Sequence, residues 1–388
     1  MLKKTILIAG VLLLVAVALF FRLMPARVEA SLNTVVPHSP YAIGTTAQTL
    51  HDSLFVADLH ADSLLWQRDL LQRSDRGHTD LPRLQAGNVA LQVFSAVTKS
   101  PSGLNNIENA SDSDDITSLA MVQLWPTATW SSLYERAAYQ LEKLNRFSAA
   151  SNGQLQVIRS QADLRDLIAI RDAGLDAVGA IYLIEGGHPL EGKIENLDRL
   201  YQGGLRVVGF THFFDNELAG SLHGIRKSGL TDFGREVVRR ADELELVIDI
   251  AHASAQSVRD ILALTNRPVI LSHGGLQGIC DTPRNLEDEL MLEVAAAGGL
   301  VGIGFWDSAI CDTSPTGLVA SIRYAIDLLG ADHVALGSDY DGTVRVPFDA
   351  AELAILTQTM LEHGFDETEI RKVMGGNAQR FFLDWLPE

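Results

Sequence analysis

The segment LFVADLHAD, residues 54–62, is a short apolar run that ends in a histidine and an aspartate. Seven more apolar runs follow, and amphipathic stretches separate them. The eight runs are residues 54–59, 89–97, 178–184, 206–211, 246–250, 269–272, 300–305 and 334–337. Most of them lack alternation of apolar and polar residues, as expected for strands that are buried on both faces. Eight strand–helix units predict an α/β fold, a (β/α)8 barrel of the TIM type over residues 49–388.

The amphipathic stretches carry signals for helix boundaries. Ser160, Thr231 and Ser254 stand as N-caps before segments of helical apolar periodicity. Residues 99–127 are instead polar and poorly periodic. This stretch predicts an inserted loop beside the active face, either a lid or a variable excursion.

The N-terminus is expected to lie outside the barrel. Lys3 and Lys4 precede an uninterrupted apolar run over residues 5–21. At about 1.5 Å per helical residue the run spans roughly 26 Å, near the lower limit for crossing a bilayer. We expect residues 1–22 to form an uncleaved membrane anchor, with a cleaved signal sequence as the alternative, since residues 28–30 (VEA) resemble a cleavage site.

Both alternatives place the remaining chain on the extracytoplasmic side, because the two lysines would stay in the cytoplasm. Residues 23–48 contain three prolines and are expected to form a polar linker. An exported compartment permits a disulfide between Cys280 and Cys311, the only cysteines. Two buried thiols are the alternative.

The formal net charge of −18 argues against a nucleic-acid partner, whose phosphates would be repelled. An acidic, soluble surface is the simplest origin of this charge. Part of the carboxylate excess can also serve metal ions, and the residues at the predicted strand ends bear on that.

In a (β/α)8 barrel the reactive groups project from the carboxyl ends of the strands. Seven residues of metal-binding type follow the apolar runs: His60, Asp62, Glu185, His212, His252, His273 and Asp339. Each alone is weak evidence, since a single histidine at a strand end is usually structural. Together they favour a metal site, because neutral imidazole and carboxylate are the ligands that suit Zn²⁺.

These residues are enough for two ions and too many for one. His60 and Asp62 are two positions apart on an extended chain, so both side chains point to one side and can hold the first ion. His252 and His273 can hold the second, and Glu185 can bridge the pair. Paired ions can share a hydroxide, lower its pKa and polarise the attacked carbonyl. A neighbouring carboxylate at residue 339 would then carry a proton from that water to the leaving amine.

Eight segments, in order and spacing together, resemble the membrane dipeptidase (renal dipeptidase) family of zinc peptidases within the amidohydrolase-like barrels. They are DLHAD (58–62), TDLPRLQAGNVALQVFS (79–95), IEGGHPL (184–190), GLRVVGFTH (204–212), SHGG (272–275), PRN (283–285), GSDYDG (337–342) and GGNAQRFF (375–382). The resemblance implies two Zn²⁺ ions per chain and hydrolysis of dipeptides, often with a D-residue on the C-terminal side. Some members of the family also open β-lactams.

The resemblance also implies roles for individual residues. His60, Asp62 and Glu185 would bind one zinc ion, and Glu185, His252 and His273 the other. Glu185 would bridge the ions, where many other amidohydrolases use a carboxylated lysine.

Three further residues match positions that contact the substrate in the family. His212 matches the histidine that contacts substrate and the tetrahedral intermediate, and Asp339 matches the catalytic aspartate. Arg284 matches the arginine that receives the substrate's terminal carboxylate, an anion that a guanidinium fork fits well.

The resemblance further implies a disulfide between Cys280 and Cys311, which lie in the loops after the sixth and seventh strands, and it suggests a homodimer. Two features depart from the family: the sequence FFDN at residues 213–216 and the length of the 99–127 loop. Both can border the pocket, so the preferred substrate side chains cannot be carried over.

Two other functions compete with a dipeptidase. A different dinuclear amidohydrolase, such as a deaminase, lactonase or β-lactam hydrolase, is disfavoured by Arg284 and Glu185. A binding protein that has lost catalysis is disfavoured because every expected ligand is present. Among other residues, we expect His188 and His223 to be solvated in loops, and His78 to order the loop before residue 89.

Overall fold

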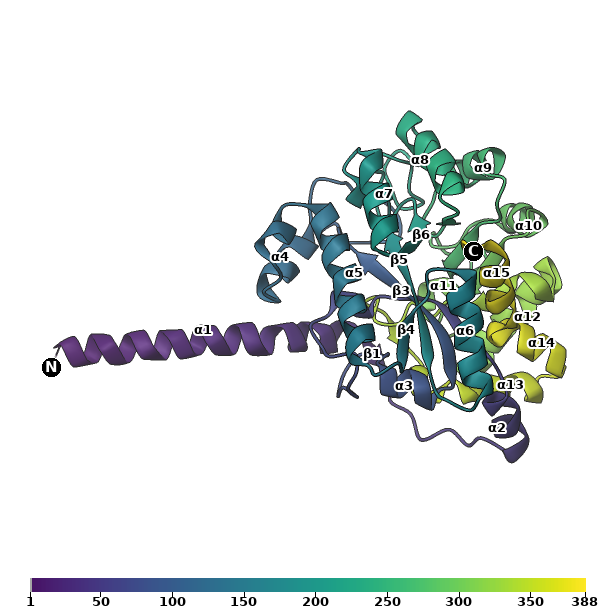
Figure 1. The fold of residues 1–388 in the computed structure, drawn as a ribbon, viewed down its shortest axis with the longest axis horizontal. Coiled ribbons are helices and arrows are strands. Elements are labelled where there is room, and N and C mark those ends of the chain that lie inside the picture. Colours follow the sequence, from purple (N-terminus) through teal and green to yellow (C-terminus); the bar gives the residue numbers. More distant parts are fainter. Residues whose placement is uncertain (1) are drawn as a thin grey trace.

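The computed structural model describes residues 2–388, and its central feature is a closed barrel of eight parallel strands with helices around it (Figure 1). The barrel strands are β2 (Val56–Ala61), β3 (Val89–Val97), β5 (Val178–Glu185), β6 (Leu205–Gly209), β7 (Val247–Asp249), β8 (Ile270–Gly274), β9 (Leu300–Ile303) and β10 (Val334–Leu336). Pairing of β3 with β5 and of β10 with β2 closes the ring. The predicted (β/α)8 barrel is confirmed.

The amino half of the barrel interior is filled by apolar side chains. One buried cluster takes a residue from every barrel strand: Leu59, Leu91, Leu183, Val207, Val247, Ile270, Leu300 and Ala335. Phe381 and Phe382 belong to the same cluster and lie on the last helix, α15 (Asn377–Trp385). The barrel is therefore a packed core, and its polar side chains gather at the carboxyl ends of the strands.

The eight predicted runs correspond to the eight barrel strands, with ends displaced by at most two residues. The predicted run 206–211 becomes β6, which ends at Gly209, because the next residues leave the sheet to form a loop. A ninth strand, β4 (Leu155–Val157), adds to β5 outside the ring and was not anticipated. Its three residues are too few to give a sequence pattern.

Helices follow or flank the strands around the barrel. They are α2 (Thr45–Asp52), α3 (Leu81–Ala86), α4 (Asp115–Val122), α5 (Leu133–Ala150), α6 (Gln161–Asp172), α7 (Ile194–Gly203), α8 (Asp232–Glu243), α9 (Ala255–Leu264), α10 (Asp288–Ala296), α11 (Asp307–Ile310), α12 (Pro315–Leu329), α13 (Ala354–Glu362) and α14 (Glu367–Arg371). The predicted N-caps Ser160, Thr231 and Ser254 each accept a hydrogen bond from the backbone N–H three residues on. Within the predicted loop 99–127, α4 forms a short helix capped by Asp114.

The first helix, α1 (Leu2–Leu32), projects from the barrel as a single long rod (Figure 1). Within its segment Lys3–Leu32, an 18-residue window has a mean hydropathy of 2.8, and this is, among the described residues, the one helix long and apolar enough to cross a membrane. A signal sequence has the same properties.

The segment expected as a polar linker, residues 23–48, is partly regular structure. The helix continues through Pro25 to Leu32, and the next residues form β1 (Thr34–Val35). This strand pairs in parallel with β11 (Arg345–Val346) in the loop that follows β10. Tertiary contacts of this segment with the barrel override its linker-like composition.

Candidate metal centre

Five of the predicted ligands come from four strands whose carboxyl ends meet in the middle of the barrel. His60 lies in β2, with Asp62 just after it, and Glu185 is the last residue of β5. His252 follows β7, and His273 lies in β8. All five side chains are buried. The structure therefore brings together residues that are more than 200 positions apart.

The carboxylate of Glu185 lies at the centre of the group. Its Oε1 atom is 3.1 Å from Nε2 of His252, 3.4 Å from Nε2 of His273 and 3.7 Å from Nε2 of His60. Its Oε2 atom is 3.4 Å from Nε2 of His212. Asp62 joins from the other side, with Oδ1 3.5 Å from Nε2 of His60.

Several ligand atoms in this group are buried without a hydrogen-bond partner. They are Nε2 of His60, Oδ1 of Asp62 and Oε2 of Glu185. The Nε2 atoms of His252 and His273 face each other at 3.0 Å. Buried polar atoms are rarely left unsatisfied, so these atoms indicate a missing partner. Imidazole and carboxylate groups that converge on one space fit a divalent metal ion such as zinc.

The charge balance of the site also favours a cation. Burial, together with the nearby Asp62, raises the pKa of Glu185 well above its usual value. Burial also raises the pKa of Asp339. Burial alone would lower the pKa of His60, but Glu185 and Asp62 outweigh it and raise that pKa to about 10. A surplus of buried carboxylates therefore stabilises positive charge here.

A second set of buried carboxylates supports the ligands and was missed in the sequence. Asp249 accepts hydrogen bonds from the backbone N–H (2.8 Å) and hydroxyl (2.7 Å) of Ser272. The Ser272 hydroxyl in turn contacts Nδ1 of His60 (3.1 Å) and of His273 (2.9 Å). Such outer partners fix the orientation of metal-binding histidines. The available signal was a carboxylate inside an apolar strand, which must find a partner when it is buried.

Asp58 has the same role on the opposite side. It accepts hydrogen bonds from the backbone N–H (2.8 Å) and hydroxyl (2.7 Å) of Ser338, the residue before Asp339.

The backbone of two residues at the site is in the left-handed region. Asp339 has a backbone φ of 60°, and His252 has the same value. A positive φ is costly for residues other than glycine and clusters at functional sites. A Cβ atom on Gly342 would overlap Oδ1 of Asp339, so a larger residue there would displace this carboxylate.

A cavity of about 340 Å³ opens over the predicted ligands. Its walls include Glu185, His212, Arg284, Trp306 and Asp339. The guanidinium of Arg284 is buried, donates to the His273 carbonyl (3.0 Å) and lies 5.3 Å from the centre of the Trp306 ring. Within residues 2–388, Arg284 forms no ion pair. It is thus a buried cation facing a small pocket and available to an anionic ligand.

The neighbouring histidines differ from their predicted environments. His188 and His223 were expected to be solvated, but both are buried, so that expectation was wrong. Nδ1 of His223 contacts the carbonyl of Asn106 at 2.9 Å, which ties two loops together. His78 does order its loop: its backbone N–H donates to Asp341. The long insertions after the strands fold over these side chains, which sequence periodicity does not reveal.

The predicted disulfide is confirmed. Cys280 and Cys311 are bonded, with their Cα atoms 5.5 Å apart. The bridge joins the loop after β8 to the short helix α11 after β9, and it braces the wall that carries Arg284 and Trp306.

Comparison with known proteins agrees with this geometry. The sequence profile of the membrane dipeptidase family (peptidase family M19) matches residues 45–384. A relative from Klebsiella pneumoniae, an uncharacterized protein in the pqqA 5' region, is 29% identical over 257 residues, which are 62% of this chain and 93% of that protein.

Solved structures share the fold. The probable dipeptidase PvdM from Pseudomonas aeruginosa has a TM-score of 0.73 at 17% identity, over 88% of this chain and 98% of its own. A metallo peptidase from Rhodobacter sphaeroides, liganded with a phosphinate mimic of the dipeptide L-Ala-D-Ala, has a TM-score of 0.69 at 24% identity, over 86% and 99%. The profile match spans most of the barrel domain and includes every residue of the metal centre. The chain therefore belongs to the membrane dipeptidase family and is a metallodipeptidase.

Proposed function

We propose that this chain binds two Zn²⁺ ions and hydrolyses the peptide bond of dipeptides. His60, Asp62 and Glu185 would hold one ion, and Glu185, His252 and His273 the other. The single observation that supports this assignment best is the Glu185 carboxylate, which lies within 3.7 Å of four imidazole nitrogens while its Oε2 atom has no hydrogen-bond partner.

When bound, a pair of zinc ions lowers the pKa of a shared water molecule and polarises the scissile carbonyl. Asp339 takes the proton of the attacking water and passes it to the leaving amine. Burial raises the pKa of Asp339 above that of an exposed aspartate, which favours its action as a general acid. Leaving-group protonation is required because an amine anion is a poor leaving group.

Two side chains orient the substrate. Arg284 binds the terminal carboxylate of the dipeptide through its guanidinium fork, since it has no carboxylate partner of its own within residues 2–388. Burial lowers the pKa of His212 to about 4, so its imidazole is neutral at physiological pH. It lines the cavity beside Glu185. There it would contact the scissile peptide group of a bound dipeptide.

The size of the cavity supports a short substrate. About 340 Å³ accommodates a small molecule, and a buried cation at its wall selects for a free carboxylate close to the scissile bond. The L-Ala-D-Ala mimic in the Rhodobacter structure supports including a C-terminal D-residue among the substrates.

The location that we propose is extracytoplasmic, with α1 as an uncleaved membrane anchor. Lys3 and Lys4 before the apolar run favour retention of the N-terminus in the cytoplasm. The disulfide between Cys280 and Cys311 is consistent with an oxidising compartment.

Metal analysis combined with a substrate panel tests the proposed activity. The purified chain is expected to contain two zinc ions and to hydrolyse L,L and L,D dipeptides, and dialysis against a chelator is expected to abolish turnover. Lactones and β-lactams serve as the competing substrates. Hydrolysis of lactones without hydrolysis of any dipeptide would contradict the proposal and favour another amidohydrolase activity.

A further inference from the structure

The long N-terminal helix is docked firmly on the barrel domain at its C-terminal end. Residues 3–20 of the helix are exposed, whereas Pro25 and Glu29 are buried. Val28 packs against an apolar cluster that includes Ile116 and Ala120 of α4. The helix is therefore free over its apolar part and fixed over its last two turns.

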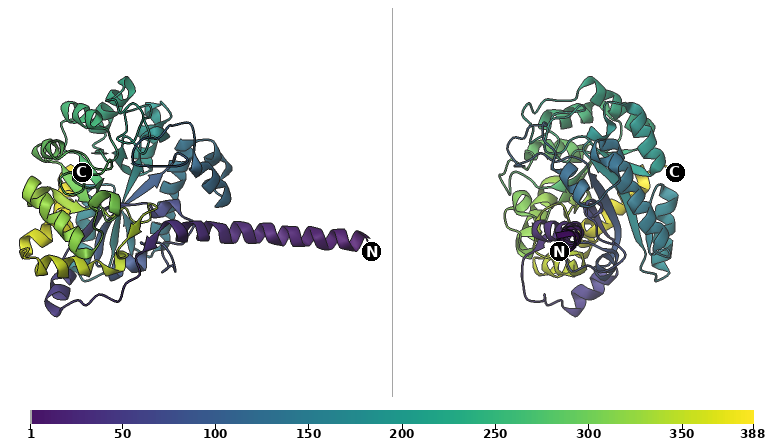
Figure 2. Two further views of the ribbon diagram at one scale, coloured as in Figure 1. Left: turned by 180° about the vertical axis from the view of Figure 1, so that it is seen from behind. Right: turned by 90° about the vertical axis from the view of Figure 1, so that its left-hand side faces the viewer.

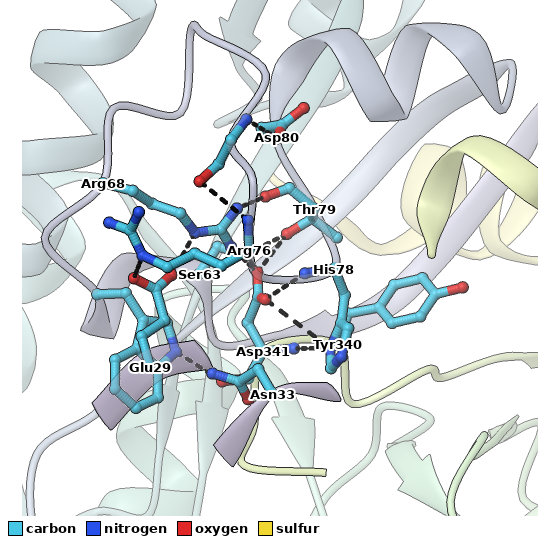
Figure 3. Close-up of polar contacts among 12 residues, drawn as sticks. Glu29, Asn33, Ser63, Arg68, Arg76, His78, Thr79, Asp80, Tyr340 and Asp341 are labelled. Atoms are coloured by element: carbon cyan, nitrogen blue, oxygen red, sulfur yellow. Dashed lines mark hydrogen bonds and ion pairs between the residues drawn. The ribbon is translucent and has the colours of Figure 1, made fainter. Parts of the chain in front are cut away.

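Glu29 fixes the helix through two arginines. Its carboxylate is 1% exposed and lies 2.7 Å from Nε of Arg68 and 2.7 Å from Nε of Arg76 (Figure 3). Arg68 also pairs with Asp341, in the loop that follows β10. Four residues after Glu29, Asn33 accepts a hydrogen bond from the backbone N–H of Thr343 (2.8 Å). The end of α1 is thus bound to the same loop that carries Asp339.

These contacts favour retention of α1. Cleavage after Ala30 would remove Glu29 and leave the side chain of Arg68, which is 2% exposed, with one carboxylate fewer. Breaking a buried ion pair by removing one partner is strongly destabilising. A segment that is removed after export should make few contacts with the folded domain, whereas Glu29 is buried in it.

The docking also leaves no spacer between the apolar run and the barrel domain. The run ends at Phe21, and the first buried residue of the helix is Pro25. Four helical residues span only about 6 Å. If residues 5–21 cross a bilayer, the barrel domain lies directly against its surface, and the rigid connection sets which face is turned to the lipid.

That face is the one with the active-site mouth. The helix α4, which follows the carboxyl end of β3, lies on the side from which α1 projects (Figures 1 and 2). Thr343, Val344 and Arg345 line the catalytic cavity, and Arg345 is in the strand that pairs with β1, just after α1. The cavity therefore opens beside the docked end of the helix.

Exposed apolar side chains gather on the same face. Beyond α1, the large apolar residues that are more than one-third exposed in the described chain are Leu104, Ile107, Met121, Leu124, Leu175, Ile225 and Leu292. Four of them lie in the 99–127 insertion. A fifth, Ile225, is close to that insertion, since the nearby His223 carbonyl accepts a hydrogen bond from the Asn109 backbone N–H (2.8 Å). Single apolar residues are common on protein surfaces, but a group on one face indicates an interaction site.

We propose that α1 holds the mouth of the active site against the bilayer and that Ile107, Leu124 and Ile225 contact lipid around it. Arg226 and Lys227 directly follow Ile225 and are exposed. Arg226 lies 3.8 Å from Asp215, which leaves Lys227 to contact anionic headgroups. This inference rests on the proposed anchor. Substrates then enter sideways, through the layer of water between protein and lipid, which admits small peptides and excludes folded proteins.

Tryptophan fluorescence in lipid vesicles tests the orientation. Three single variants of the full chain are reconstituted in vesicles with and without brominated lipid. They are Ile107→Trp, Leu124→Trp and Ile225→Trp. Leu175→Trp is the matched control, because Leu175 is 62% exposed, against 65% for Ile107 and 61% for Leu124, and precedes β5 at the opposite end of the barrel. The wild-type signal, with its five native tryptophans, is subtracted.

Brominated lipid is expected to quench the fluorescence of the tryptophans introduced at residues 107, 124 and 225 at least twice as strongly as that of the control. Equal quenching at both ends of the barrel, or none at the mouth, would overturn the proposal. So would a mature chain whose mass shows that α1 has been removed. Dipeptide hydrolysis by the same variants in detergent is a separate readout: its absence counts against the proposed activity and not against the orientation.

Discussion

Asp339 and Asp341 are two residues apart, yet they enter two buried clusters of opposite character. Asp339 borders the candidate metal centre, which consists of His60, Asp62, Glu185, His252 and His273. Asp341 belongs to an arginine cluster, formed with Glu29, Arg68 and Arg76 (Figure 3). Both aspartates are buried and both have a positive backbone φ, 60° and 64°. Neither burial nor backbone strain distinguishes a metal site from a structural one.

The difference lies in whether each carboxylate has partners within the protein. Asp341 accepts hydrogen bonds from the Ser63 hydroxyl (2.6 Å) and the His78 backbone N–H (2.6 Å), and it pairs with Arg68. Burial alone would raise the pKa of Asp341, but Arg68 outweighs it and lowers that pKa. Glu185 has no arginine partner in the described chain; burial and the nearby Asp62 outweigh His60 and raise its pKa. Unmatched negative charge, rather than the number of carboxylates, marks the place for metal ions.

Replacement of the central carboxylate should have the largest effect. Glu185→Gln keeps the size of the side chain but removes the charge that two ions would share. We expect it to abolish turnover and to lower the zinc content below that of the wild type. Activity assays and elemental analysis of the same preparation measure both effects, and wild-type rates in this variant would rule out a bridging role.

The matching substitution in the arginine cluster should affect stability instead. Asp341→Asn leaves the buried Arg68 without its carboxylate on that side, so the free energy of unfolding should fall by about 3–5 kcal/mol. The zinc content of the folded fraction should stay at the wild-type value. Denaturant titration gives the first number. Loss of metal at unchanged stability would show that the two clusters are not distinct.

Removal of the unpaired arginine at the cavity wall should mainly weaken substrate binding. Arg284→Met keeps much of the packing against Trp306 but loses the charge-assisted hydrogen bonds to a terminal carboxylate, which contribute about 1.5–3 kcal/mol. A decrease of roughly 10- to 150-fold in kcat/KM is expected. Dipeptide amides, which lack the carboxylate, are the control: they should lose little activity in the variant, and an equal loss would argue against this contact.

The smallest of these effects is expected at the outer carboxylate. Asp249→Asn should weaken the hold on Ser272 and, through it, on His60 and His273, lowering zinc affinity or activity by about 10- to 100-fold. Asp58→Asn, on the other side of the barrel, is the parallel variant. A competition titration measures the zinc affinity of both variants. An unchanged affinity in both would mean that these carboxylates contribute to stability alone.

Much of the fold could be predicted from sequence because the barrel strands are buried on both faces and so appear as continuous apolar runs. The ligands could be grouped because the carboxyl ends of parallel strands must meet at one end of a barrel. Their roles came from the family resemblance. Glu185 is the clearest case, since a single carboxylate at a strand end is compatible with a helix cap or a solvated side chain as well as with a metal ligand.

The arginine cluster could not be predicted. Glu29, Arg68 and Asp341 are distant in sequence, and charged residues are so common on protein surfaces that nothing marks these three as buried partners. The extension of α1 beyond residue 22 depends on these contacts, so the helix boundary was missed for the same reason. Short elements such as α4 and β4 are too brief to show periodicity.

The proposed function depends on two cations that share Glu185 at the mouth of the barrel. Anomalous diffraction at the zinc absorption edge, from crystals of the zinc-supplied protein, tests it most directly. Two peaks are expected, one on each side of this carboxylate: the first beside His60 and Asp62 and the second beside His252 and His273. A single peak, or none, with Glu185 turned away from the histidines would contradict it.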